Sequence, residues 1–238
     1  MVLRNWLLGF VNHYDNDSLI SRIRRKRMHY FRELLHSLPD NGKGKLSILD
    51  IGGDPIFWTN VGLDSERYDL TLVNLGHRTP NSANMSCIVG DATDLSMINP
   101  ELVDVVFSNS VIEHVGDFSR QKKMAEEMFS MDAPIFLQTP NYWFPMEPHF
   151  VFPFFQFLPI RVRTWLMTRF NLGGYDRIPD WDTAREHVYQ IQLLSRRQLS
   201  RLFPGSKIKR ERLFGLTSGF IVTWGWSGKK EDPSGNSR

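Results

Sequence analysis

The stretch LSILDIGG at residues 46–53 decides the fold of this chain. A short apolar run that ends in two glycines is typical of a buried strand that stops at a tight turn. Glycines at a strand end also let the backbone pass close to a ligand, because no Cβ stands in the way. The stretch therefore predicts a first core strand over 46–51 and a ligand-binding turn at Gly52 and Gly53.

Further strands are predicted by four apolar runs downstream, at Leu70–Val73, Cys87–Val89, Val103–Phe107 and Ile135–Leu137. Helical or loop segments separate these runs. One of them carries core-facing methionines at helical spacing, Met124, Met128 and Met131. Apolar strands that alternate with helices indicate a parallel sheet with both faces covered.

The C-terminal part follows a different pattern. Ser195 and Gln198 form a capping box that predicts a short helix, which Pro204 and Gly205 end. Two strand-like runs follow, Lys207–Phe214 and Gly219–Trp226, and they predict an antiparallel hairpin. The expected fold is α/β, a three-layer doubly wound sheet that is mostly parallel and closes with an antiparallel hairpin strand.

Composition excludes several classes of protein. The 238 residues carry 29 Lys and Arg against 26 Asp and Glu, and a net charge of +3 is too balanced for a dedicated nucleic-acid binder. A single cysteine, Cys87, rules out a disulfide framework or a cysteine-based zinc site within one chain. No apolar run approaches the roughly 20 residues of a membrane span. The apolar patch at 6–11 is too short for a signal peptide. We expect one cytoplasmic domain.

The two ends of the chain lie outside this core. Residues 18–37 predict an amphipathic helix that Asp17 caps. Its basic run Arg22–Arg27 is interpreted as a solvated face, with contact to an anionic partner as the alternative. The tail 227–238 has no apolar residue to bury and is expected to be disordered.

Polar residues follow the predicted strands. Ligands of doubly wound sheets bind beyond the carboxyl ends of the strands, so these residues are the candidates for cofactor binding. Taken singly, Asp50 and Asp91 could equally cap a strand or start a turn. The candidate set is Asp50, Gly52, Gly53, Asp54, Asn74, Leu75, Asp91, Ala92, Asn109 and Ser110.

These segments resemble the class I S-adenosylmethionine-dependent methyltransferases, which have a Rossmann-like fold. The resemblance rests on ILDIGG at 48–53, GDATDL at 90–95, VDVVFSNSVIEHV at 103–115 and the closing hairpin LFG…SGFIVTWG at 213–225. GGDPIFW and TPNYWFPMEPHF are similar to a bacterial subgroup of these enzymes. The resemblance covers about residues 30–226. It implies S-adenosylmethionine as cofactor and methyl transfer to an oxygen or nitrogen of a small or medium-sized acceptor, with saccharides and lipid-linked molecules among the candidates.

The chain departs from the family pattern at several points. Asp54 and Ile56 stand where the family has further glycines, and Asn74 stands where an acid usually holds the ribose. Ubiquinone-pathway O-methyltransferases have a similar Glu-His pair and use it with an acid three positions earlier to hold a divalent cation. The corresponding residue here is Ser110, so no metal is expected.

His114 is the first candidate for catalysis. Methyl transfer needs a base only when the attacking group carries a proton. The resemblance puts His114 near the transferred methyl group, as a general base or a residue that positions the nucleophile, with Glu113 to orient it. The alternative is that this Glu-His pair begins a helix and is structural.

An aromatic segment follows the fifth strand: 8 of the 17 residues from Tyr142 to Leu158 are aromatic. Four prolines prevent a regular helix across it. Long ordered loops are usually functional, so residues 141–190 are interpreted as a substrate lid between a cofactor core (46–140) and a closing unit (191–226). The candidate substrate residues are Asn141, Tyr142, Trp143, Glu147 and His149.

Other interpretations stay open. Residues 160–170 alternate arginines with apolar residues, which suits either a buried helix with snorkelling arginines or contact with a membrane surface. His187 could face the site. A nicotinamide-dependent oxidoreductase is disfavoured because no G-x-G-x-x-G follows a strand. A degenerate cofactor-binding domain that acts through a partner or a membrane, without catalysis, is the remaining alternative.

Overall fold

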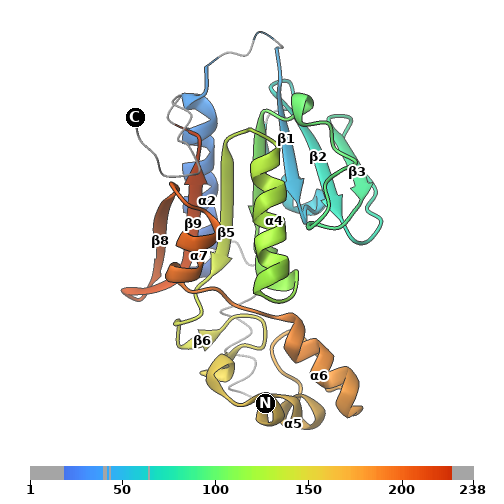
Figure 1. Ribbon diagram of the computed structural model, residues 1–238, viewed down its shortest axis with the longest axis vertical. Helices are drawn as coiled ribbons and strands as arrows, with labels where there is room; N and C mark the ends of the chain where they lie inside the picture. Colours follow the sequence, from blue (N-terminus) through green and yellow to red (C-terminus); the bar gives the residue numbers. More distant parts are fainter. Residues whose placement is uncertain (1–18, 40–41, 43, 64, 227–238) are drawn as a thin grey trace.

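A seven-stranded sheet forms the centre of the molecule. The computed structural model describes residues 19–39, 42, 44–63 and 65–226. The strand order is β3-β2-β1-β4-β5-β9-β8 (Figure 1). The strands are β1 (Leu46–Ile51), β2 (Tyr68–Asn74), β3 (Met85–Val89), β4 (Val105–Asn109), β5 (Ile135–Pro140), β8 (Lys207–Leu213) and β9 (Leu216–Trp224).

The first five strands are parallel, while β9 pairs antiparallel with both β5 and β8. The predicted mostly parallel sheet with a closing antiparallel hairpin is therefore confirmed. The fourth strand starts two residues later than predicted. The physical reason is a short 3-10 turn, η1 (Pro100–Leu102), which Asn99 caps and which Val103 ends.

Helices cover both faces of the sheet. On one face lie α2 (Leu19–Ser37) and α3 (Pro55–Val61). On the other lie α4 (Phe118–Ser130) and α7 (Arg196–Leu202). Alternate residues of the strands face the two layers, so the molecule has a hydrophobic core on each side.

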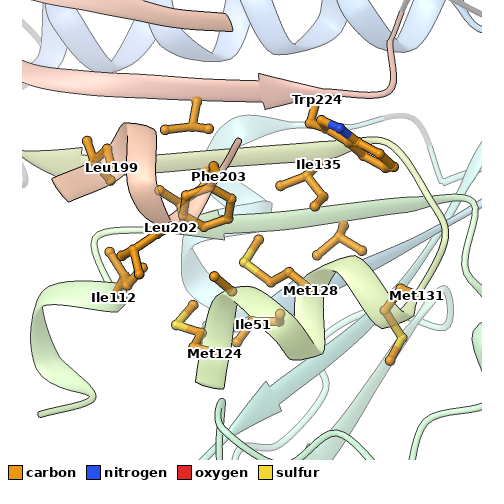
Figure 2. Packing of buried hydrophobic residues seen from close by; sticks show 14 of the residues in the cluster. Ile51, Ile112, Met124, Met128, Met131, Ile135, Leu199, Leu202, Phe203 and Trp224 are labelled. Atoms are coloured by element: carbon orange, nitrogen blue, oxygen red, sulfur yellow. The ribbon is translucent and has the colours of Figure 1, made fainter. Parts of the chain in front are cut away.

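The methionine stripe of α4 belongs to the core, as predicted. Met124 and Met128, together with Met131 just after the helix, are buried in one cluster with Leu202 of α7 and Phe203, which follows α7 (Figure 2). The predicted capping box that opens α7 is also confirmed, because the Ser195 and Gln198 side chains each bond the other's backbone. The helix predicted over 18–37 is α2; its proposed cap, Asp17, lies outside the described residues.

The segment predicted as a lid is a small unit with its own core. It contains the paired short strands β6 (Met146–Glu147) and β7 (Phe152–Pro153), the 3-10 turn η3 (Phe155–Phe157), and helices α5 (Ile160–Arg169) and α6 (Trp181–Gln190). Another 3-10 turn, η2 (Ile112–His114), follows β4 and belongs to the sheet part of the chain. Figure 1 shows β6, α5 and α6 together beyond the carboxyl end of β5. Its buried residues include Phe150, Phe155, Met167, Leu172, Ala184 and Val188.

The segment 160–170 contains helix α5, which ends at Arg169, and both interpretations of this segment allow a helix. Thr164 and Met167 are buried, whereas Val162, Trp165 and Phe170 are exposed. Among the helices described, not one has the length and apolar character that a bilayer span requires.

Candidate active site

The predicted glycine turn after β1 is present. Packing within the protein also requires a glycine at this turn, independently of any ligand. The Gly52 amide donates to the Val73 carbonyl at 2.7 Å. Its φ is +82°, and a Cβ there would lie 2.3 Å from a methyl group of Val111. Glycine at this position is therefore needed for close packing of β1 against the loop after β4.

Asn74 holds this turn from the end of β2. Its amide nitrogen donates to the carbonyl oxygens of Gly53 at 3.0 Å and Gly52 at 3.4 Å, and its amide oxygen accepts from the Gly76 amide at 3.2 Å. An aspartate could not donate to these two carbonyls. The departure from the acid expected here thus has a local reason, and the side chain that was expected to bind a ribose is engaged with the turn.

Asp50 lies in the core and not on the ligand edge. Its carboxylate is 2% exposed and accepts a hydrogen bond from Trp58 Nε1 at 2.6 Å. Burial raises the pKa of Asp50 to about 8, against the opposing effect of the Trp58 bond. Its contacts are those of a structural residue that anchors α3, which sequence reasoning could not separate from a cofactor ligand.

A partly exposed carboxylate stands at the end of β3. Asp91 accepts hydrogen bonds from the Thr93 amide and hydroxyl at 2.9 Å and from Arg120 at 2.8 Å. Partial burial would raise the pKa of Asp91, but these bonds outweigh burial and lower it. Ala92 is partly exposed, and Leu75, at the end of β2, is 75% exposed. An acid and an open apolar side chain therefore face solvent at this edge.

The Asp91 carboxylate and the exposed Leu75 side chain match some of the groups of an adenosine-type ligand. The Asp91 carboxylate can accept from an amino group, although that group would share an oxygen with Arg120, and Leu75 offers an apolar surface for a ring. No described residue offers a free acid for a ribose diol. Asn74 is engaged, and Asp54 caps α3 and lies 3.3 Å from Arg78.

A second network fixes the end of β4. Arg27, in the basic run of α2, donates to both oxygens of Glu211 at 2.8 Å and to Asn109 Oδ1 at 2.5 Å. Gln138 donates to Glu211 at 3.1 Å and accepts from the Ser110 hydroxyl at 2.8 Å. The solvated-face interpretation is therefore wrong for Arg27. Asn109 and Ser110, expected to bind cofactor, are bonded within this network.

Glu113 is fully buried behind the sheet edge. Its Oε2 accepts from the Thr139 hydroxyl at 2.9 Å, and its Oε1 has no hydrogen-bond partner among the described residues. Burial raises the pKa of Glu113, and the neighbouring His149 opposes the rise. The side chain thus faces Thr139 and His149; its expected role of orienting His114 has no hydrogen bond in the described structure to support it.

His149 lies between two buried carboxylates. Its Nδ1 is 2.7 Å from Glu147 Oε1, and its Nε2 is 4.0 Å from Glu113 Oε1. Burial alone would lower the pKa of His149, but Glu147 and Glu113 outweigh it and raise the pKa. The ring of His114 packs edge-on against His149 at 4.6 Å. His114 is exposed on one side, but neighbouring atoms that displace water from the ring and the charge of His149 lower its pKa to about 4.

The same group could hold a metal ion. Glu113, His114 and His149 bring three ligand atoms within 4.8 Å of one another. One carboxylate and two imidazoles suit zinc and similar transition metals. The expectation of no metal rested on Ser110; His149 supplies a third donor from the lid, which spacing around Glu113 could not reveal.

A cavity of about 190 Å³ opens beside this cluster in the lid. Tyr142 and Glu147, two of the residues expected on the substrate side, line it. Sequence reasoning missed the polar Gln156, Arg163 and Gln192, which line it with the apolar Phe150, Phe155, Ile191 and Leu193. A signal for Gln156 was present, because it is the only polar residue between Phe150 and Ile160.

Other residues assigned to the substrate side lie elsewhere. Asn141 is buried; its side chain donates to the Thr217 carbonyl at 2.8 Å and accepts from the Trp143 amide. Trp143 is exposed and contacts Tyr142 and Phe157. His187, for which no role was assigned, packs against Tyr175 in the lid.

Comparison with known proteins places the fold. No protein-family model and no curated protein sequence matches the chain. Among solved structures, the N-methyltransferase NodS from Bradyrhizobium japonicum, in complex with S-adenosyl-L-homocysteine, is similar with a TM-score of 0.51 and 13% identity, over 92% of this chain and 95% of NodS.

Two further structures are similar at lower scores. The CurJ carbon methyltransferase has a TM-score of 0.48 and 14% identity, over 81% of this chain and 51% of CurJ. This chain therefore spans only part of CurJ. A methyltransferase from Aquifex aeolicus has a TM-score of 0.45 and 12% identity, over 83% and 87% of the two chains. At these identities the likeness to NodS shows a shared Rossmann-like fold.

Proposed function

We propose that this chain is an S-adenosylmethionine-dependent methyltransferase that acts on an oxygen or nitrogen of a small or medium-sized acceptor. The observation that carries the proposal is the carboxyl edge of the sheet. There the glycine turn after β1 and the partly exposed Asp91 after β3 lie on one edge of the sheet, and Tyr142, which follows β5 by two residues, lines the lid cavity. A saccharide or a lipid-linked molecule is a candidate acceptor.

The chain's own residues would bind the cofactor by backbone and side-chain contacts at this edge. Asp91 would accept from the adenine amino group, and Leu75 and Ala92 would contact the ring. Gly52 and Gly53 would leave room for the backbone to approach. When bound, S-adenosylmethionine supplies a methyl group on a positively charged sulfur for in-line displacement.

On the acceptor side, His114 is proposed to position the attacking group. With a pKa of about 4 its ring is neutral near pH 7, so a ring nitrogen is free to accept a hydrogen bond from that group, although the ring is only a weak base. Glu147 and Glu113 lie on either side of His149, which packs against His114. We assign the positive charge between the two carboxylates to protonated His149 and not to a metal. Activity that a chelator abolishes and zinc restores would contradict this assignment.

Calorimetric titration with S-adenosylhomocysteine and with NADH tests the proposal. We expect the first to bind below millimolar and the second not to bind. Replacing Asp91 by Ala should weaken binding by about 10-fold or more, because a charge-assisted hydrogen bond is lost. The matched control is Asp94→Ala, at an exposed position in the same loop. NADH binding would favour an oxidoreductase, and binding without turnover would favour a domain that has lost activity.

Peripheral membrane contact is a second proposal, on a separate observation. Trp143, Phe154 and Phe157 are exposed on the lid, and their rings contact one another through Phe157. Clustered exposed aromatic rings are common where proteins touch a bilayer surface. Co-sedimentation with anionic vesicles tests it: Trp143→Ser combined with Phe154→Ser should abolish vesicle binding, and unchanged binding would exclude this surface.

A further inference from the structure

The lid cavity has one apolar side and one polar side. Phe150, Phe155, Ile191 and Leu193 supply apolar surface, and Tyr142, Gln156 and Arg163 supply polar groups. An apolar pocket with a few placed polar groups is typical of a site for a small ligand. Glu147 links the cavity to the proposed reaction site, because it lines the cavity and also bonds His149.

Two residues that line this cavity each carry a buried polar atom without a partner in the described part of the chain: Gln156 Oε1 and Arg163 Nε. The Gln156 amide nitrogen donates to the carbonyls of Tyr142 and Phe144 at 2.9 and 2.6 Å. These two bonds fix the amide, so its oxygen cannot rotate to another donor. A buried polar atom without a partner destabilises the fold unless a ligand or water satisfies it.

The charges at the cavity favour an anion of single charge. Burial lowers the pKa of Arg163, yet a guanidinium stays protonated at any physiological pH. The Glu147 carboxylate offsets part of this positive charge, but its two oxygens bond His149 and the Phe150 amide and do not pair directly with the guanidinium. That same carboxylate in the wall would repel a dianion such as phosphate. A carboxylate therefore fits best, and the planar guanidinium matches its geometry.

The volume of the cavity and the unpartnered Gln156 oxygen indicate the remaining features of the ligand. A cavity of about 150 Å³ accommodates a benzene ring, so 190 Å³ accommodates one six-membered ring with small substituents. Gln156 Oε1 requires a donor, which a hydroxyl group provides. We propose that the cavity binds a hydroxylated ring that carries a carboxylate, with the carboxylate on Arg163 and a hydroxyl on Gln156. The role of this cavity as the subsite for the methyl acceptor rests on the function proposed above.

Three sugars that differ only at one carbon test the charge requirement. Glucuronate carries a carboxylate there, glucose a hydroxymethyl group and glucose 6-phosphate a phosphate. Ligand-observed NMR on the full chain gives the three dissociation constants. We expect glucuronate to bind about 10-fold or more tightly than glucose, since a charge-assisted hydrogen bond is gained, and glucose 6-phosphate to bind less tightly than glucuronate.

Variants on one helix assign the effect to one side chain. Arg163→Met should remove the preference for glucuronate over glucose, and Arg161→Met, at an exposed position of α5, should keep it. Gln156→Leu should weaken binding of glucuronate and glucose to a similar extent. Thermal unfolding checks that each variant is folded. Equal affinity for the two sugars, or a preference that survives in Arg163→Met, would overturn the proposal.

Titration of the same samples with S-adenosylhomocysteine separates this inference from the proposed function. If the nucleoside does not bind but glucuronate does, the subsite stands and the methyl-transfer proposal fails. If the nucleoside binds but no sugar shows a preference, the methyl-transfer proposal stands and the carboxylate subsite fails. Tighter binding of glucose 6-phosphate than of glucuronate would replace the carboxylate by a phosphate.

Discussion

Arg27 in helix α2 and Glu211 in strand β8 form a two-pronged ion pair, although 184 residues separate them in the sequence. The Arg27 side chain is 10% exposed and that of Glu211 is 7% exposed. Arg27 also donates a hydrogen bond to Asn109, at the end of β4, and Glu211 accepts one from Gln138, in β5. The pair therefore ties the N-terminal helix and the closing hairpin to the strand that leads into the site.

Replacing Glu211 by Gln should destabilise the protein by on the order of 3 kcal/mol, because a nearly buried guanidinium loses its counter-charge. Urea unfolding measures the change. The control is Glu126→Gln, which breaks the exposed pair of Lys122 and Glu126 and should cost about 0.5 kcal/mol or less. Equal effects of the two variants would show that the Arg27 pair contributes no more than a surface pair.

Stability should depend on pH through Asp50. Its pKa is raised from 3.8 to about 8 in the folded protein, so the folded state keeps a proton that the unfolded state releases. Stability from this group is therefore present at low pH and is lost as pH rises from about 4 to about 8. Asp50→Asn removes the titration, and its stability relative to the unchanged protein should increase between pH 5 and pH 8.

Chemical unfolding midpoints at several pH values measure this difference. Asp69→Asn, at an exposed position of β2, serves as the control and should follow the unchanged protein at every pH. If the Asp50→Asn curve also runs parallel to that of the unchanged protein, the carboxyl group does not hold its proton in the folded state.

Gly173 should be essential for the position of His149. Its φ is +56°, and a Cβ there would lie 2.3 Å from the His149 carbonyl oxygen. Gly173→Ala should therefore destabilise the lid by about 1–3 kcal/mol and lower methyl transfer, because the backbone at His149 must move. Gly174→Ala is the matched control, since nothing lies within 4 Å of its Cβ position. Thermal unfolding and turnover of both variants decide the point.

Asn74→Asp, the change toward the acid expected from the resemblance, should destabilise the protein. The aspartate would lose the donor that bonds the carbonyls of Gly52 and Gly53 and would place a charge beside them, at a cost of about 1–3 kcal/mol. Asn99→Asp is a control because Asn99 only accepts, from the Glu101 amide. A stable Asn74→Asp protein with tighter S-adenosylhomocysteine binding would mean that position 74 contacts the ribose.

The neighbouring side chains of His114 and His149 should have clearly different pKa values. At pH 6.5 a free histidine is half protonated, but we expect His149 to be mostly charged and His114 to be neutral down to about pH 5. NMR of the imidazole carbons, assigned with single variants, measures both. Glu147→Gln removes one carboxylate and should lower the pKa of His149. A neutral His149 at pH 6 would contradict the proposed charge arrangement.

The fold was predictable from the sequence because its signals are local. Apolar runs, the glycine turn after β1, the methionine stripe and the capping box at Ser195 each lie within one element. Most strand bounds nevertheless moved by one to three residues. The turn η1 delays the start of β4, whereas β2 and β3 each begin two residues before their predicted apolar runs, and β9 begins at Leu216 in place of Gly219. The hairpin of β8 and β9 followed from two strand runs joined by a short turn.

The site was only partly predictable, because it depends on contacts between distant segments. Asp50 and Asn109 carry the right chemistry at the right strand ends, yet Trp58 and Arg27 engage them. The meeting of Glu113 with His149 follows from how the lid packs on the sheet, which spacing does not encode. Burial also decided the role of Arg163, which the sequence suggested only as a snorkelling side chain.

The separate core of the lid has a consequence for how this chain can change over time. Residues 142–191 pack largely on one another, and described hydrogen bonds join their ends to the sheet layers at Asn141 and Gln192. The groups that would choose an acceptor thus lie in one continuous stretch of chain, apart from the turns at β1 to β3. A single recombination event could exchange that stretch and alter the molecule being modified, while the cofactor edge of the sheet is inherited intact.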